Sequence, residues 1–130
     1  MRARHYFLTV TAAIVLVSAT VMAQQETDAP MTFFVTGESH SGDLGGLAGA
    51  DATCQRLATE VGADDSTWRA YLSTYRTVTE PAVNARDRIG NGPWHNARGV
   101  MIAPSVADLH GDIQRDRDLI YRATALTESG

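Results

Sequence analysis

The sequence predicts a small α+β domain, in which one main helix packs on a mixed antiparallel sheet. Apolar residues recur every three or four positions from Leu47 to Val61, and this spacing places them on one face of a helix. Apolar and polar residues then alternate from Trp68 to Ser73, which is typical of a half-buried strand. Two further runs rich in apolar and β-branched residues, Met31–Thr36 and Val100–Ala103, complete the expected sheet.

The turns and the shorter elements are predicted from local signals. Gly62 directly follows the apolar stripe, where a glycine can adopt the left-handed conformation that ends a helix. The polar stretch 74–84 predicts an irregular surface connection. Ser105 stands three residues before Asp108, a capping spacing that predicts a short helix at this point. Leu119–Leu126 is expected to form one more edge strand.

The first 23 residues have the features of a secretory signal peptide. A basic start, Met1–His5, precedes the apolar run Tyr6–Met22, and Val21 and Ala23 occupy the minus-three and minus-one positions of a signal-peptidase site. The alternative is a retained membrane anchor, but threonine and serine residues dilute the apolar run. We therefore expect cleavage after Ala23 and a secreted, periplasmic or cell-surface protein.

After the signal peptide we expect a flexible leader, residues 24–30, and a single domain, residues 31–130. The whole chain carries a net charge of −4, and cleavage would remove two arginines and make it more acidic. This charge argues against nucleic acid or an anionic membrane as the main partner. An extracellular glycan or protein is the expected class of partner.

Cys54 is the only cysteine of the sequence. An exported protein normally pairs its cysteines, so a lone one indicates a free thiol, a bridge to another chain or a missing partner. Because Cys54 lies on the apolar stripe of the predicted helix, we expect a buried and unreactive thiol rather than a nucleophile.

The stretch from Gly45 to Cys54, followed by Trp68–Ser73, resembles the opening of endostatin-like domains. It is similar also to a bacterial family of secreted, lectin-like domains of unassigned function. Members of that family carry three later motifs, which here are Ala85–Ile89, Gly92-Pro93-Trp94 and Leu109–Asp112. The resemblance covers roughly residues 33 to 130.

The resemblance implies a C-type lectin-like fold, in which the first and last strands pair. It also implies a disulfide between Cys54 and a cysteine near the C-terminus, but the sequence holds no second cysteine. A closing strand of the expected type is likewise not visible in the sequence. We therefore expect an incomplete lectin-like fold, the N-terminal part of a longer domain.

The lectin resemblance raises the question of a calcium-dependent sugar site, which needs several converging oxygen ligands. Glu80-Pro81 is followed by Ala82 instead of the asparagine or aspartate that such sites carry, and no Trp-Asn-Asp motif follows. A surface turn is the simpler interpretation of Glu80-Pro81. We expect no metal and no cofactor.

Arg86, Arg88, Trp94 and His95 form the best candidate cluster for ligand binding. Arginine and tryptophan are common anchors at binding surfaces, and the face of Trp94 would suit a sugar ring. The simpler interpretation is that Trp94 fills the core beside Trp68 while Asp87 pairs with a neighbouring arginine.

The rival class is a small extracytoplasmic enzyme that uses the loop with Ser39 and His40. Ser39 lies in a Gly-x-Ser-x-Ser sequence that partly resembles a nucleophile elbow, and His40 could bind zinc with Glu38 and Asp43. The chain is too short for the large sheet that presents such a serine, and the histidines show no paired spacing. We therefore predict an exported, non-catalytic binding or adhesion module; a structural remnant without a ligand is the third possibility.

Overall fold

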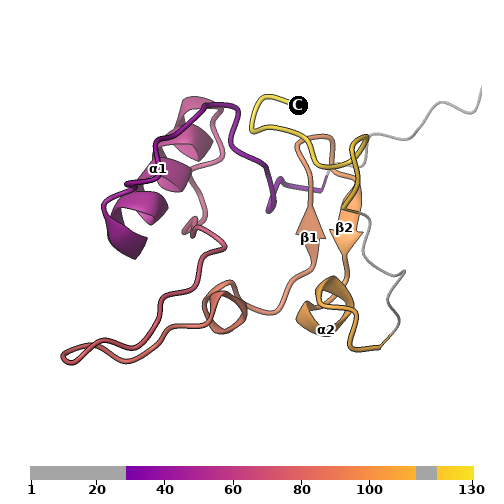
Figure 1. Cartoon of the computed structure of the whole chain (residues 1–130). Coiled ribbons are helices and arrows are strands. Elements are labelled where there is room, and N and C mark those ends of the chain that lie inside the picture. The colour runs from indigo at the N-terminus through magenta and orange to yellow at the C-terminus, as the bar shows by residue number, and fades with distance from the viewer. Residues whose placement is uncertain (1–28, 114–119) are drawn as a thin grey trace, which may run out of the picture.

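The computed structural model describes residues 29–113 and 120–130. The predicted signal peptide and all but the last two residues of the predicted leader lie outside the described residues. The chain forms a small mixed α/β domain with one main helix and a two-stranded antiparallel sheet (Figure 1). In chain order the elements are α1 (Gly46–Glu60), the 3-10 helix Ala85–Arg88, β1 (Trp94–His95), β2 (Met101–Ala103) and α2 (Val106–Leu109).

Helix α1 confirms the predicted main helix within one residue at each end. Its buried face carries Ala50, Leu57 and Ala58, all on the apolar stripe. Glycine is required at Gly49, because a Cβ atom there would lie 2.0 Å from the carbonyl oxygen of Leu44. The glycine at this position therefore has a steric reason.

The segment Trp68–Ser73 shows the predicted burial pattern from Trp68 to Tyr71, but Leu72 is exposed instead of buried, and the segment is not part of a sheet. Trp68 and Ala70 are buried, while Arg69 and Tyr71 between and beyond them are exposed. Among the described residues, however, this segment pairs with no strand and runs beside α1 instead. The prediction of a strand is wrong here because polar side chains of the helix supply the hydrogen bonds that a neighbouring strand would otherwise make.

The predicted first strand, Met31–Thr36, is reduced to one parallel bridge between Val35 and Thr127. The backbone N–H groups of Thr32 and Phe33 both donate to the carbonyl oxygen of His95, each at 2.9 Å. The segment therefore lies between β1 and the C-terminal residues without forming a full ladder with either.

The edge strand predicted at Leu119–Leu126 is also not observed in its described part. Residue 119 lies outside the described residues, and Tyr121 to Thr124 form a turn, closed by the bond from Ala125 N–H to the Tyr121 carbonyl at 2.9 Å. Within residues 120–130, Leu126 and Thr127 pair with the first segment, through the bond from Val35 N–H to the Leu126 carbonyl and the Val35–Thr127 bridge.

The connection 74–84 is a projecting hairpin-like loop, visible at the lower left of Figure 1. Thr74 and Val83 exchange two backbone hydrogen bonds of 2.9 and 3.1 Å at its base. Tyr75 and Val78 are almost fully exposed on it. The predicted surface connection is thus confirmed, with more order at its base than its composition indicated.

The C-terminal half packs around a core of Trp94, Ile102 and Ala103, against which Phe33 and Leu109 also lie. Helix α2 begins at the predicted cap, because the hydroxyl oxygen of Ser105 accepts from the backbone N–H of Asp108. Trp68 is not in this core and packs on Phe34 with ring centroids 4.8 Å apart. The two tryptophans therefore belong to separate clusters.

Candidate binding cavity

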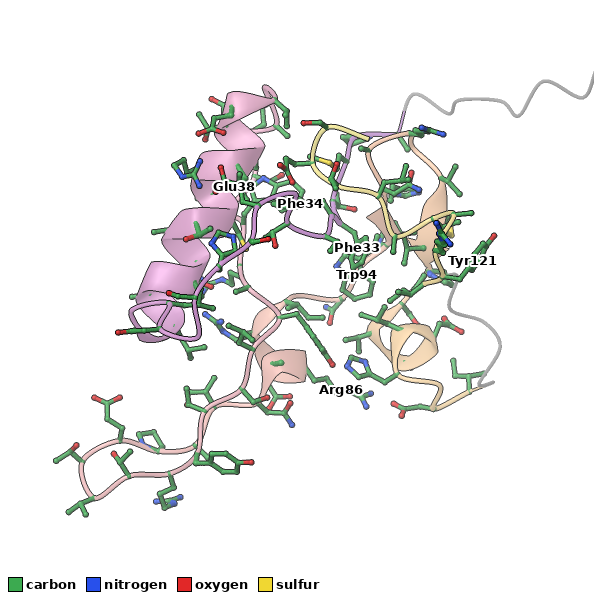
Figure 2. The ribbon with its side chains drawn as sticks, turned by 45° about the horizontal axis from the view of Figure 1, so that its top comes forward. Phe33, Phe34, Glu38, Arg86, Trp94 and Tyr121 are labelled. Carbon is green, nitrogen blue, oxygen red and sulfur yellow. The ribbon has the colours of Figure 1, made fainter. Side chains whose placement is uncertain are left out.

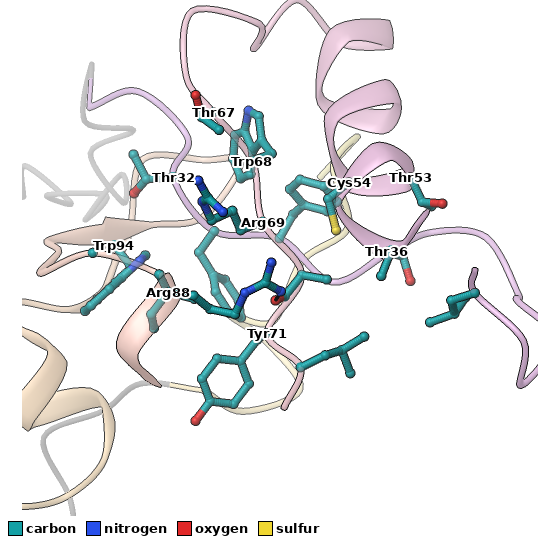
Figure 3. Close-up of a pocket in the computed structure, with 18 of the residues that line it drawn as sticks. Thr32, Thr36, Thr53, Cys54, Thr67, Trp68, Arg69, Tyr71, Arg88 and Trp94 are labelled. Carbon is teal, nitrogen blue, oxygen red and sulfur yellow. Dashed lines mark hydrogen bonds between the residues drawn. The ribbon is translucent and has the colours of Figure 1, made fainter. Parts of the chain in front are cut away.

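A cavity of about 730 Å³ lies between α1, the segment 67–72 and the core around β1 (Figure 3). Its size falls within the usual range for small-ligand sites. The residues that line it are Thr32, Phe33, Phe34, Thr36, His40, Leu44, Ala50, Thr53, Cys54, Thr67, Trp68, Arg69, Ala70, Tyr71, Leu72, Arg88, Ile89, Gly90, Trp94, Leu109 and Ile120.

The lining of the cavity is aromatic and carries positive charge. Five of its residues have aromatic rings: Phe33, Phe34, Trp68, Tyr71 and Trp94. Two arginines and one histidine accompany them, and no aspartate or glutamate is found among the lining residues that the structure describes. This is unusual for a chain that has 15 acidic residues against 11 basic ones. The cavity is therefore suited to a ligand with apolar faces and negative charge.

Arg88 holds the cavity wall together. Its guanidinium donates to Asp51 Oδ2 at 2.5 Å and to the Ala70 carbonyl at 3.0 Å. Asp51 Oδ1 in turn accepts from the Ala70 backbone N–H at 2.8 Å. One arginine thus joins the 3-10 helix to α1 and to the segment 67–72, with only 10% of its side chain exposed. Arg88 therefore has internal partners and links parts of the structure.

Arg69 differs from Arg88 because it is exposed and lines the cavity without a partner. Within the described part of the chain, no hydrogen bond or ion pair is made by its guanidinium. Figure 3 places Arg69 near Thr32 and Trp68 at the cavity. A carboxylate or other anion of a ligand could pair with it at little cost, since no internal pair has to be broken.

Cys54 faces the same cavity from α1. The thiol is free and the residue is half-buried, so the expectation of full burial is wrong: the cavity leaves one side of it open. Burial raises the pKa of the Cys54 thiol, and the negative charge of Asp51 adds to the effect. The thiol is therefore less reactive than an exposed one, in the direction that the sequence predicted.

The four residues of the predicted binding cluster do not form one site. Arg88 and Trp94 line the cavity, whereas Arg86 and His95 do not. Arg86 pairs with Asp112, whose hydrogen bond raises the pKa of the guanidinium. Figure 2 shows Trp94 next to Phe33 in the interior and Arg86 away from both.

The fourth member, His95, has a backbone role. Its N–H donates to the hydroxyl of Thr32 at 2.8 Å, and its carbonyl accepts from the first segment.

The expected pairing of Asp87 with a neighbouring arginine is wrong as well, since both arginines beside it bind other carboxylates.

The residues of the rival enzymatic site are not assembled for catalysis. Ser39 is exposed, and within residues 29–113 and 120–130 it makes no hydrogen bond to His40. Glu38 pairs with Arg56 at 2.6 Å, which lowers the pKa of that carboxyl group. Asp43 accepts from the backbone N–H of Gly45 at 3.0 Å. Among the described residues no group of three histidine, cysteine, aspartate or glutamate side chains could hold a metal ion.

Sequence reasoning did not single out Asp51, Arg69 or Tyr71 as site residues. The alternation from Trp68 to Ser73 did place Arg69 and Tyr71 on the outward face of that segment. A sequence signal for Asp51 was its position on the helix face that also carries Cys54 and Leu57. Its partner, Arg88, lies 37 positions away, so their pairing depends on the fold.

No protein-family model matches the chain, and neither a curated protein nor a solved structure is found to match it. No helix formed by the described residues is long and apolar enough to cross a membrane.

Proposed function

We propose that this chain is an exported, non-catalytic binding module of lectin-like type and that its ligand occupies the cavity between α1 and the β1 core. The observation that carries the proposal is the cavity itself: an aromatic lining, an arginine without an internal partner, and a volume of about 730 Å³. Binding sites commonly combine an apolar wall with a few polar groups in this way.

The lectin-like part of the proposal is supported by the sequence motifs and by one contact. The bridge between Val35 and Thr127 joins the first and last described segments of the domain. The resemblance implies that the first and last strands pair, and the contact here is a single parallel bridge between those two segments. Export is supported by the signal-peptide features, and mass spectrometry of the secreted protein should find an N-terminus at Gln24.

The enzymatic alternative has weaker support. A serine nucleophile needs a base within hydrogen-bond reach, and a zinc site needs three or four converging ligands. The loop with Ser39 and His40 offers neither among the described residues. Ser39→Ala and His40→Ala should therefore leave any measured hydrolytic activity unchanged.

The lone thiol in the cavity wall permits a direct test. The full chain is treated with N-ethylmaleimide at about pH 9, because the raised pKa of Cys54 makes the thiolate scarce at neutral pH. Binding to immobilised glycans and extracellular proteins is then compared before and after treatment. We expect alkylation to weaken binding at least tenfold.

Cys54→Ala, treated in the same way, is the matched control and should keep its binding. If alkylated and untreated protein bind every immobilised partner equally well, the ligand does not occupy the cavity. If no glycan or protein is bound by either form, the chain is a remnant without a ligand.

A further inference from the structure

We infer that the ligand of the cavity is an acidic polypeptide segment, bound in extended form along residues 67–72. This inference rests on the proposed function and names the chemical class of its ligand. It depends on three observations: the unpaired backbone groups of two residues, the sign of the charge in the cavity, and the aromatic rings that line it.

The backbone hydrogen bonds described for the segment 67–72 are made by its even-numbered residues. The N–H of Trp68 donates to Gln55 Oε1 at 3.0 Å, and the N–H of Ala70 donates to Asp51 Oδ1 at 2.8 Å. The Ala70 carbonyl accepts from Arg88 and from the N–H of Leu72. Gln55 and Asp51 both lie on α1, so the N–H groups of Trp68 and Ala70 bind the helix, whereas the Leu72 N–H closes a three-residue turn around Tyr71.

The backbone groups of the odd-numbered residues Arg69 and Tyr71 are open to a ligand. In extended backbone the peptide groups of successive residues point in opposite directions, as in a strand that has a neighbour on one side. In the described structure, the backbone N–H and C=O groups of Arg69 and Tyr71 make no hydrogen bond. These four groups lie on a segment that borders the cavity along its whole length. They can bind the main chain of an added strand.

The charge of the cavity selects an acidic strand. Arg69 has no partner within the described residues, His40 also lines the cavity, and no described lining residue is acidic. The rest of the chain has a net negative charge, so an acidic peptide is attracted to the cavity and repelled elsewhere. A peptide carboxylate can bind the Arg69 guanidinium through two parallel hydrogen bonds.

The aromatic residues of the cavity suit the second face of the bound peptide strand. Side chains of a strand alternate between its two faces, so acidic residues facing Arg69 would alternate with apolar ones. The rings of Phe34 and Trp68 contact each other and line the cavity beside the open backbone groups. The expected ligand is therefore a segment in which acidic and apolar residues alternate.

A soluble pool of random octapeptides tests the inference on the full chain. Peptides that slow the alkylation of Cys54 by N-ethylmaleimide are recovered and sequenced. We expect recovered peptides to be enriched in aspartate and glutamate, and their affinity to fall as salt rises. Methylating the backbone nitrogens of one such peptide at alternate positions should weaken binding at least tenfold in one register, because these nitrogens then cannot donate to Arg69 or Tyr71 carbonyls.

Arg69→Gln should weaken the same peptides about tenfold, because a charged hydrogen-bonded pair is lost. Arg76→Gln is the matched control, since Arg76 is exposed on the projecting hairpin and does not line the cavity. This variant should bind as the unchanged protein does.

Four results would overturn the inference. Recovered peptides without acidic enrichment would exclude an acidic ligand, and peptides indifferent to N-methylation in both registers would exclude strand addition. If oligosaccharides protect Cys54 and no peptide does, the ligand is a glycan and the proposed function stands. If peptides bind equally well to alkylated protein, the cavity is not their site and the proposed function fails with the inference.

Discussion

Arg88 contacts both elements of the cavity wall through one planar group. Its guanidinium reaches a carboxylate on α1 and a carbonyl on the segment 67–72, and that carboxylate binds the same segment. Arginine suits this position because its donors form a rigid fork, whereas lysine has a single nitrogen on a flexible stem. The result is a closed set of three hydrogen bonds in which each partner is held by two others.

Removing one residue of this hydrogen-bonded set should lower the stability of the fold. We expect Arg88→Ala to lower the free energy of unfolding by about 2–4 kcal/mol, because it leaves the largely buried Asp51 carboxylate without its partner. Arg88→Lys should recover only part of this loss. Urea denaturation followed by tryptophan fluorescence measures both.

The exposed Arg76→Ala is the control for Arg88 and should change stability by no more than about 0.5 kcal/mol. Equal stability of the Arg88→Ala variant and this control would show that the link is not stabilising.

The sequence predicted the residue types of the site better than it predicted which individual residues line the cavity. Trp94 and Arg88 were candidates because of their residue types, and both line the cavity. Arg86 was a candidate for the same reason, but its carboxylate partner lies 26 positions away and holds it elsewhere. Which arginine is paired and which is free depends on distant contacts that residue type does not reveal.

Helix α2 is short enough that its cap decides whether it forms. The Ser105 hydroxyl oxygen accepts from the Asp108 backbone N–H at 3.1 Å and donates to Asp108 Oδ2 at 2.6 Å. A helix of four residues has few internal hydrogen bonds of its own, so the cap fixes its start.

Ser105→Ala should therefore lower the free energy of unfolding by about 1 kcal/mol, the usual cost of losing a serine cap. Thr79→Ala, on the exposed part of the projecting hairpin, serves as the comparison and should have no measurable effect. Thermal unfolding by circular dichroism distinguishes the two. A Ser105→Ala variant as stable as Thr79→Ala would mean that contacts of α2 with β2 suffice.

Both α-helices were predicted and most of the strands were not, for a physical reason. A helix closes its hydrogen bonds within four residues, so periodicity and caps reveal α1 and α2 directly. A strand needs a partner elsewhere in the chain, and alternation reveals only which side is buried. Trp68–Ser73 shows this: the burial of Trp68 and Ala70 follows the alternation, although Leu72 is exposed, and side chains of α1 take the place of the missing strand.

Acidity should weaken the whole molecule through its exposed ion pairs. Arg56 lowers the pKa of Glu38, and Arg86 lowers the pKa of Asp112, each mainly through a hydrogen bond to the carboxylate. A carboxyl group whose pKa is lower in the folded state stabilises the fold above its ordinary value and loses that contribution as the pH falls through the folded-state value. The loss should begin near the ordinary glutamate value of 4.5 and continue below the aspartate value of 3.8.

Asp112→Asn isolates one of these contributions. This variant should be less stable than the unchanged chain at pH 7 and should lose less stability between pH 5 and 3, because it no longer has that carboxylate to protonate. Urea midpoints at several pH values measure the slope. Parallel curves for the two proteins would mean that the pair with Arg86 does not contribute to the acid response.

The projecting hairpin connects two parts of the chain, and these parts also contact each other outside the hairpin. Arg76 lies exposed on the loop, so brief trypsin treatment should cut there early and leave one piece with α1 and one with β1, β2 and α2. The Asp51–Arg88 pair and the hydrogen bonds from Thr32 and Phe33 to His95 cross from one piece to the other. The nicked protein should therefore elute as a single non-covalent complex in gel filtration and separate only on a denaturing gel, which would make the chain a natural split protein for fragment complementation.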